Sequence, residues 1–122
     1  MNFDEFVEFE PTNYRSNKPT IRIRNTYSID LSKSAIDLGG FEFDYKGSCK
    51  CSVLIDAVNF TFAIKMNPNG KFTLKKYRTN FSLNSSSLID YLIKLGYLEK
   101  KHYITTSSVK GVLLIKREDN HD

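Results

Sequence analysis

The sequence of 122 residues contains no tryptophan, two cysteines, two histidines and three prolines. Two cysteines are too few for a disulfide framework. No apolar run approaches the roughly 18 residues that a membrane-spanning helix needs, and the acidic start at Asp4 and Glu5 is unlike the basic head of a secretory signal. The chain is long enough for one domain, and its composition is that of a folded protein. We therefore expect a cytoplasmic protein without membrane contacts.

Cys49 and Cys51 are separated by one residue, so on a β-strand both thiols would lie on the same face. Such a pair could supply two zinc ligands. However, the only histidines are His102 and His121, and no second cysteine pair completes a set of four ligands. We therefore predict reduced thiols, and we expect neither a metal nor a cofactor.

The sequence contains serine, histidine and carboxylate side chains, but not in the arrangements that known types of catalysis require. Serines abound, but His102 follows two lysines at the start of an expected strand, where a surface position is a better interpretation than a general base. The glycines lack the spacing of a phosphate-binding loop. Paired carboxylates would have to come from Asp30, Asp37, Glu42, Asp44 and Asp56. The four aspartates could form a metal-dependent nuclease, but their spacing is not diagnostic. The sequence predicts a protein that is not an enzyme.

Charge is distributed unevenly along the chain. The net charge is +4, but residues 1–10 carry four acids and residues 118–122 carry three, so residues 11–117 hold all 18 basic residues and a net charge of +11. Residues 11–29 and 57–89 contain basic residues and no acid. A field of this sign attracts polyanions or an acidic protein surface. The alternative is that lysine-rich faces are simply solvated.

A loose internal repeat runs through the middle of the chain. Residues 28–30 align with residues 82–84 at an offset of 54, and residues 62–65 align with residues 113–116 at an offset of 51. An internal repeat indicates a fold built from two similar units. Each unit alone would bury too little apolar surface to be stable, so we expect the two to share one core.

Both units show the same order of elements. The alternation in residues 20–24 and, more weakly, in residues 72–75 predicts a half-buried strand. Ser32 and Ser85 are suitable N-caps for short helices, the first around residues 33–38 and the second ending at Gly96.

A hairpin is expected to follow each helix, formed by residues 53–56 with 60–65 and by residues 103–105 with 112–116. We therefore predict an α+β, β-rich fold in which two tandem strand-helix-hairpin units form one pseudo-two-fold domain. The predicted parts are an N-terminal acidic and aromatic arm (1–19), a first repeat unit (20–66), a joint (67–71), a second repeat unit (72–117) and an acidic tail (118–122). The arm is expected to cover a sheet edge or to shield the cationic middle.

Residues 21–36 resemble the opening of AbrB/MazE-type swapped-hairpin domains, and residues 53–65 resemble their closing hairpin. The resemblance spans most of residues 20–117 and implies a tandem-duplicated AbrB-like domain. Members of that family dimerise and bind DNA through basic residues of the first strand and its loop. Carried over to this chain, the DNA-binding role falls on Arg22, Arg24 and Lys33, and in the second unit on Lys75, Lys76 and Arg78.

The short chain, rich in lysine and asparagine, is also similar to accessory proteins of phages and other mobile elements in bacteria. We predict a non-enzymatic nucleic-acid-binding module in a bacterial host cell, either monomer or homodimer. One alternative is an anti-CRISPR-type inhibitor that uses the same basic face on a host CRISPR effector nuclease, and another is an antitoxin. The candidate contacts are the basic residues Arg22, Arg24, Lys33, Lys65, Lys71, Lys75, Lys76 and Arg78, with the tyrosines Tyr14, Tyr27 and Tyr77 as possible stacking partners.

Overall fold

The computed structural model describes residues 18–24, 27–78, 80–99 and 101–117. The predicted acidic tail and all but the last two residues of the predicted arm lie outside these ranges. Eight β-strands and two α-helices occur within them. Their bounds, in chain order, are β1 Thr20–Arg24, β2 Ser28–Leu31, α1 Lys33–Gly39, β3 Ser48–Asp56, β4 Thr61–Met66, β5 Phe72–Tyr77, β6 Asn80–Asn84, α2 Ser86–Lys94, β7 His102–Thr106 and β8 Val112–Lys116.

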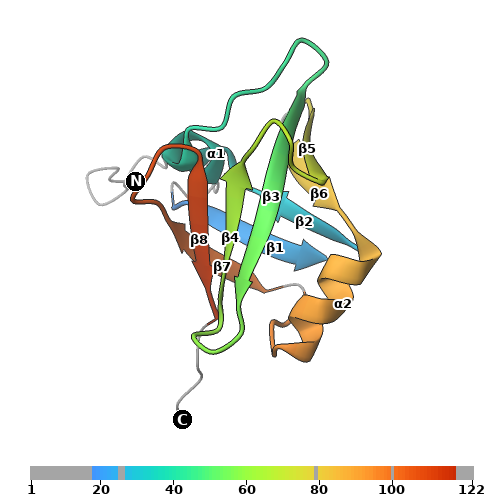
Figure 1. The fold of residues 1–122 in the computed structure, drawn as a ribbon, viewed down its shortest axis with the longest axis vertical. Helices are drawn as coiled ribbons and strands as arrows, with labels where there is room; N and C mark the ends of the chain where they lie inside the picture. Colours follow the sequence, from blue (N-terminus) through green and yellow to red (C-terminus); the bar gives the residue numbers. More distant parts are fainter. Residues whose placement is uncertain (1–17, 25–26, 79, 100, 118–122) are drawn as a thin grey trace, which may run out of the picture.

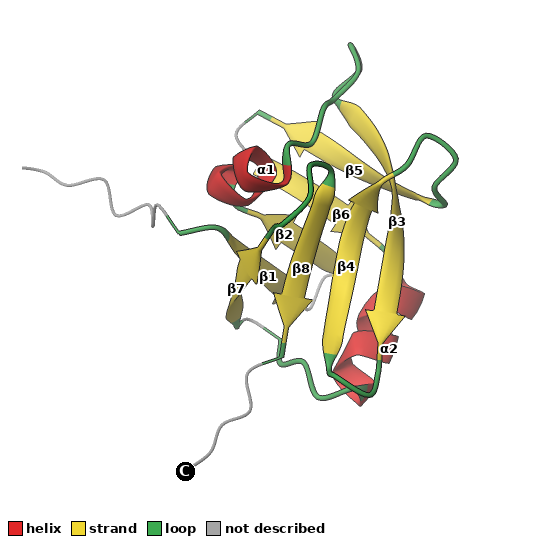
Figure 2. Cartoon of the chain, turned by 60° about the vertical axis from the view of Figure 1, so that its left-hand side comes forward, coloured by secondary structure: helices red, strands yellow, loops and turns green. Residues whose placement is uncertain are grey.

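The strands close into one antiparallel barrel in the order β1-β2-β6-β5-β3-β4-β8-β7 (Figure 1). Alternate side chains of each strand point inward, as the period of a strand requires. On β1, for example, Ile21 and Ile23 are fully buried, whereas Arg22 between them is only partly buried. The two helices lie on opposite sides of the barrel (Figure 2). Ile36 of α1 and Leu92 of α2 belong to the same buried cluster as the inward strand residues, so the molecule has one core.

The predicted α+β fold of two strand-helix-hairpin units is wrong, and so is the AbrB-like swapped-hairpin assignment. The described residues form a closed eight-stranded barrel with two short helices. The predicted order of elements omitted β2 and β6, which precede the helices. These two strands pair with each other, with Ile29 opposite Leu83, and thereby help to close the barrel. Both are short, so the alternation in each covers too few residues to stand out.

The local predictions at the helix starts are confirmed. The Ser32 hydroxyl accepts a hydrogen bond from the Ala35 N–H at 3.1 Å, and the Ser85 hydroxyl accepts one from the Leu88 N–H at 3.2 Å. The predicted hairpins are also present as the pairs β3–β4 and β7–β8. Local sequence signals therefore identified these elements correctly, although not how they assemble.

The order of the strands has an internal symmetry. Exchanging β1–β4 with β5–β8 leaves every neighbour relation in the barrel unchanged. Ile29 opposes Leu83 in the β2–β6 ladder, and Ala63 opposes Leu114 in the β4–β8 ladder. The residue numbers in these pairs differ by 54 and 51, the offsets of the sequence repeat. An approximate two-fold axis therefore passes through these two pairs, on opposite sides of the barrel.

Cys49 and Cys51 lie on the same face of β3, as their spacing predicted, and this is the inner face. Both are buried free thiols, and Lys50 between them is exposed. Burial raises the pKa of Cys51 to about 11 and also raises the pKa of Cys49. The thiols are therefore protonated at neutral pH, the unreactive form of the side chain.

The longer of the two described helices, α2, has nine residues. In the part of the chain that the structure describes, no helix has the length and apolar character needed to cross a membrane.

Candidate nucleic-acid interface

A continuous row of polar side chains crosses the outside of six neighbouring strands. Each member lies directly opposite the next across a strand pair, and each has at least one sequence neighbour that is buried in the core. We call it the polar row. In order around the barrel it consists of Ser48, Lys75, Ser82, Asp30, Arg22 and His102.

Asp30 is the acid of this row, and it is paired with a base. Arg24 Nη1 donates to Asp30 Oδ2 at 2.9 Å, and both side chains are partly exposed. Such a pair contributes little to stability, but it cancels the negative charge of the row. Arg22 lies beside Asp30 in the ladder, and its buried Nε atom has no hydrogen-bond partner among the described residues. The row therefore keeps a positive charge at Arg22 and another at Lys75.

Four basic residues gather where β5 ends, and we call this group the cationic tip: Lys46, Lys75, Lys76 and Arg78. The loop between α1 and β3 rises to the top of the molecule in Figure 1, beside the upper ends of β3 and β5. The Lys76 N–H donates to the Gly47 carbonyl at 2.8 Å, which holds this loop against β5. Lys46 thereby joins three cations that are almost 30 residues further along the chain.

Asp44 is the nearest acid in the loop, and its carboxylate is engaged in the turn. Asp44 Oδ1 accepts hydrogen bonds from the backbone N–H groups of Ser48 at 3.0 Å and Lys46 at 2.8 Å. The hydrogen bond from Ser48 is the main cause that lowers the pKa of Asp44, and the charges of Lys46 and Lys75 also contribute. Asp44 thus stays ionised and shapes the loop. Its single negative charge does not neutralise the four cations of the tip.

Two tyrosines stand on the cationic tip. Tyr45 is 92% exposed and Tyr77 is 53% exposed. The Lys46 ammonium lies 5.5 Å from the centroid of the Tyr45 ring, and the Lys76 ammonium lies 5.9 Å from that of Phe81. Cations and aromatic faces are therefore interleaved at this end of the molecule, an arrangement suited to phosphates and bases.

Arg78 has an unusual backbone conformation. It lies in the turn between β5 and β6 with φ of 54°, in the left-handed region that favours glycine. Tyr27, in the turn between β1 and β2, has φ of 60°. Backbone strain of this kind often occurs at functional positions, and here the sequence keeps a basic side chain where glycine would relax the turn.

The structure brings together only some of the basic residues proposed from the sequence. Lys75, Lys76, Arg78 and Tyr77 lie on the cationic tip, and Arg22 and Arg24 lie on β1 at the polar row and beside it. The other described candidates are scattered: Lys33 begins α1, Lys65 lies on β4, Lys71 precedes β5 and Tyr27 lies beside the start of α2. Tyr14 lies outside the described residues.

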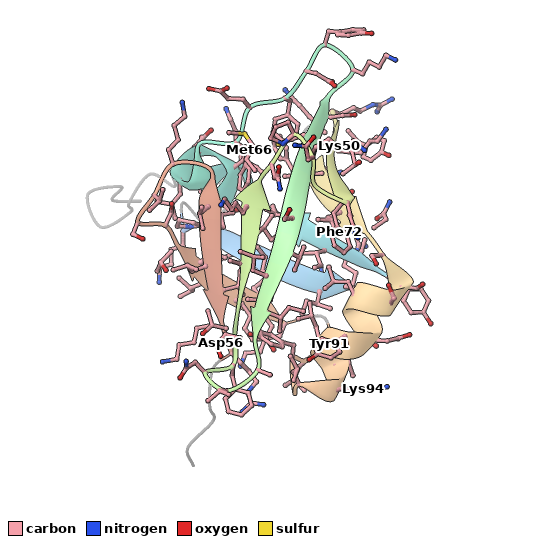
Figure 3. All side chains as sticks on the ribbon, in the orientation of Figure 1. Lys50, Asp56, Met66, Phe72, Tyr91 and Lys94 are labelled. Carbon is pink, nitrogen blue, oxygen red and sulfur yellow. The ribbon has the colours of Figure 1, made fainter. Side chains whose placement is uncertain are left out.

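Two basic residues near this surface were not among the candidates. Lys46 is part of the cationic tip, and Lys50 lies on the outer face of β3, two residues from Ser48. Figure 3 shows Lys50 in the upper part of the molecule, far from Tyr91 and Lys94 on α2. The turn-forming residues 44–47 were the available signal for Lys46, since they predict an exposed loop.

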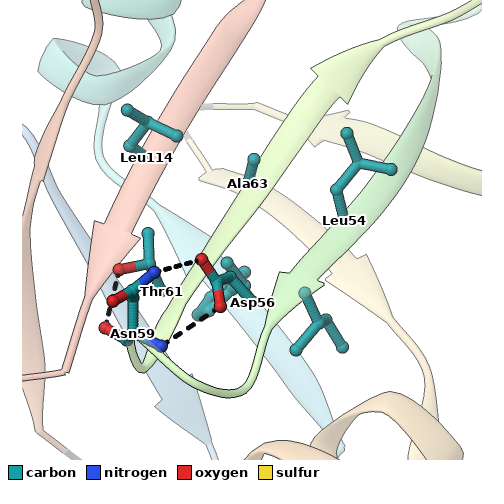
Figure 4. Close-up of a pocket in the computed structure, with 8 residues that line it drawn as sticks. Leu54, Asp56, Asn59, Thr61, Ala63 and Leu114 are labelled. Atoms are coloured by element: carbon teal, nitrogen blue, oxygen red, sulfur yellow. Dashed lines mark hydrogen bonds between the residues drawn. The ribbon is translucent and has the colours of Figure 1, made fainter.

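A shallow depression of about 410 Å³ lies on the outer face of β3, β4 and β8. Its walls include Leu54, Ala63 and Leu114, which Figure 4 shows around the β3–β4 hairpin. Asp56 is its one titratable lining residue. The carboxylate of Asp56 is taken up by the turn, because it accepts from the Val58 N–H and from both the backbone and side-chain amides of Asn59. This depression therefore has a mainly apolar lining, and its lining residues include no acid and base placed to act together in catalysis.

The described residues contain no group of three or more His, Cys, Asp or Glu side chains that could hold a metal ion. The fold and its surface define a class of protein: a closed eight-stranded antiparallel β-barrel with a cationic tip and a polar row. No family model matches the chain, and no curated protein or solved structure is significantly similar to it. The comparisons therefore give no support to the AbrB/MazE resemblance either.

Proposed function

We propose that the protein is a non-enzymatic nucleic-acid-binding module that docks its cationic tip and polar row on phosphates. The observation that carries the proposal is the gathering of four cations from residues 46 and 75–78 where the α1–β3 loop meets the end of β5, with the loop acid Asp44 engaged in a turn. Basic residues that face phosphates position a protein on nucleic acid without reading its sequence.

The electrostatics of the tip support a polyanionic partner. No ion pair links Lys46, Lys75, Lys76 or Arg78 to an acid in the described part of the chain, whereas Arg24 and Lys110 each have one. Like charges held close together repel one another, and a bound polyanion relieves this repulsion. The other described acids are dispersed on β2, α1, the end of β3, α2 and the loops, so they leave the tip positive.

The test is a salt series with labelled duplex DNA, duplex RNA and single strands, measured by fluorescence anisotropy. The tip variant changes Lys46, Lys75, Lys76 and Arg78 to Gln. The control changes Lys33, Lys65, Lys94 and Lys116 to Gln and removes the same charge from α1, β4, α2 and β8. We expect the tip variant to bind more than tenfold more weakly and, on duplex DNA, to flatten the salt dependence of log Kd by about 3 to 4. Equal losses in both variants, or an affinity that salt does not change, would contradict the proposal.

The inhibitor remains the second candidate, because exposed tyrosines beside lysines are also typical of protein-binding hot spots. Tyr45 and Tyr77 would then contact a protein surface. This function predicts a stable complex with a CRISPR effector nuclease in size-exclusion chromatography and little affinity for bare nucleic acid. No observation on the structure favours the antitoxin, which stays a prediction from the sequence.

A further inference from the structure

We infer that the cationic tip takes single-stranded nucleic acid in preference to duplex, with the rings of Tyr45 and Tyr77 stacking on unpaired bases. The inference rests on the proposed function and specifies its ligand. The shared chemistry is an unpaired base between two phosphates, which single-stranded DNA and RNA both offer.

The exposure of the two rings is the first observation. Tyr45 and Tyr77 present most or half of their surface to solvent, whereas Tyr97 and Tyr103 are buried in the core. An exposed aromatic ring gains little from folding, because its apolar faces stay in water. A stacked base would cover these faces, and every base has a π-face to offer.

The Tyr45 ring is carried on a loop that is held at several points. Asp44 accepts two backbone hydrogen bonds from within the loop, and the Gly47 carbonyl accepts one from Lys76. Gly47 has φ of 74°, and a Cβ there would lie 3.3 Å from the Lys76 carbonyl oxygen, so the close approach of loop and strand requires glycine. A loop whose backbone is already held loses less entropy when the side chain that it carries binds a base.

The two tyrosines lie at the same end of the barrel. Tyr45 is two residues from Gly47, and Tyr77 follows Lys76, the residue hydrogen-bonded to Gly47. Chain dimensions place their Cα atoms within about 16 Å of each other. Lys46 lies next to one ring, and Lys75 and Arg78 lie close to the other in sequence, so phosphates on either side of a stacked base find a cation.

The shape of the tip favours a single strand over a duplex. Bases in a duplex are stacked on each other and paired, so a ring on a protruding loop cannot reach their faces without opening the helix. A duplex would contact the cations alone and leave Tyr45 and Tyr77 without a role. A flexible single strand can place its bases on the rings and its phosphates on the cations simultaneously.

The experiment compares 12-nucleotide oligo-dT and oligo-U with a 12-base-pair DNA duplex at one salt concentration. Tyr45→Leu and Tyr77→Leu remove each ring and keep an apolar side chain, and Tyr45→Phe and Tyr77→Phe keep the ring. Tyr91→Leu on α2, 45% exposed, is the matched control. We expect each Leu variant of the tip to lose about tenfold in affinity for single strands and little for duplex, while the Phe variants and Tyr91→Leu bind like the parent protein.

The absence of tryptophan adds an independent readout, because tyrosine emission is then directly visible. Oligo-dT should quench part of this emission in the parent protein, and less of it in Tyr45→Leu. Circular dichroism checks that each variant is folded, and Tyr45→Leu lies in a loop, so one informative variant is available even if Tyr77→Leu destabilises β5.

Each outcome is decisive. If duplex binds as tightly as oligo-dT and oligo-U, or if the Leu variants lose affinity for duplex and single strands equally, the inference is wrong while the proposed function stands. If one of oligo-U and oligo-dT binds more tightly than the other, and the Leu variants of the tip lose the expected affinity for it, the inference is supported. The tighter of the two then shows whether single-stranded RNA or DNA is the ligand. If none of the three nucleic acids binds, the proposed function fails and the inference fails with it.

Discussion

Tyr97 joins two parts of the core through its hydroxyl and its ring. The hydroxyl donates to the Phe60 carbonyl at 2.7 Å, and the ring meets Phe62 and Tyr103 edge-on at centroid distances of 5.2 and 5.3 Å. Burial is the main cause that raises the pKa of Tyr97, to about 12. The folded state therefore favours the neutral phenol, and its contribution to stability is complete below pH 10, the pKa of an unperturbed tyrosine.

This contribution should be lost as the pH rises from 10 toward 12. We expect Tyr97→Phe to lower the free energy of unfolding at pH 7 by about 1 kcal/mol, because the Phe60 carbonyl loses the hydroxyl donor and keeps only the Arg117 N–H. In denaturant titrations at a series of pH values, the variant should show a shallower decline than the parent protein between pH 10 and 12. Cys51 titrates in both proteins, so the difference between them isolates Tyr97. Parallel declines in the two proteins would refute this assignment.

A substitution at Arg78 should weaken nucleic-acid binding without lowering the stability of the fold. Gly is unstrained at its φ of 54°, so we expect Arg78→Gly to leave the free energy of unfolding unchanged or to raise it by up to about 1 kcal/mol. The same change removes a cation from the tip and should weaken nucleic-acid binding severalfold. Tyr27→Gly is the matched control, since Tyr27 has a similar φ but lies in the β1–β2 turn. A variant Arg78→Gly that binds at full strength would remove Arg78 from the interface.

At the scale of the element, two serines with the same role differ in what they bind. Ser32 Oγ accepts from the Ala35 N–H and also from the Thr20 N–H at 3.0 Å, so it ties α1 to the start of β1. Ser85 Oγ caps α2 through the Leu88 N–H. We expect Ser85→Ala to cost about 1 kcal/mol and Ser32→Ala about 1 kcal/mol more, as measured by urea unfolding.

The control for both substitutions is Ser86→Ala, in the first turn of α2, where alanine is a better helix former and no loss is expected. If Ser32→Ala and Ser85→Ala have the same effect, then the hydrogen bond from Thr20 contributes nothing measurable.

Elements could be predicted from the sequence where their signal is local. A capping serine acts on the N–H three residues ahead, and the two sides of a hairpin are close in sequence, so the caps of α1 and α2 and the hairpins β3–β4 and β7–β8 were identified. β2 and β6 leave no comparable signal. Each pairs with a sequence neighbour, β1 or β5, as well as with the other, which lies more than 50 residues away. With four and five residues, each carries too little alternation to be recognised as a strand.

The same reason explains what could be predicted of the candidate site. The acid-free stretch pointed to Lys75, Lys76 and Arg78, which are neighbours in sequence. Lys46 joins them only because the loop docks through Gly47, which composition does not reveal. Lys65 has the same charge but lies on β4, which β3 separates from β5 in the barrel. The charge of each residue could be read from the sequence. Which basic residues come together on the surface depends on the order of the strands.

At the scale of the whole molecule, the two cysteines report on whether the barrel opens. Both thiols point from β3 into the interior of the barrel. This strand is paired with β4 on one side and with β5 on the other. We expect a thiol reagent such as DTNB at pH 8 to label them only through unfolding, at a rate that yields the global free energy of unfolding. Full reactivity should appear in denaturant. Rapid labelling under native conditions would show that β3 detaches from the barrel without global unfolding.

Closure of the barrel also restricts how this protein can meet a partner. Every described strand is hydrogen-bonded to a neighbour on each side over at least part of its length, so none of them is a sheet edge with a whole free row of backbone N–H and C=O groups. The described fold therefore disfavours recognition by β-augmentation, and it disfavours growth into a cross-β stack without prior unfolding. Whatever binds this surface must be held by side chains and loops, and for that reason point substitutions should be able to abolish binding while leaving the scaffold intact.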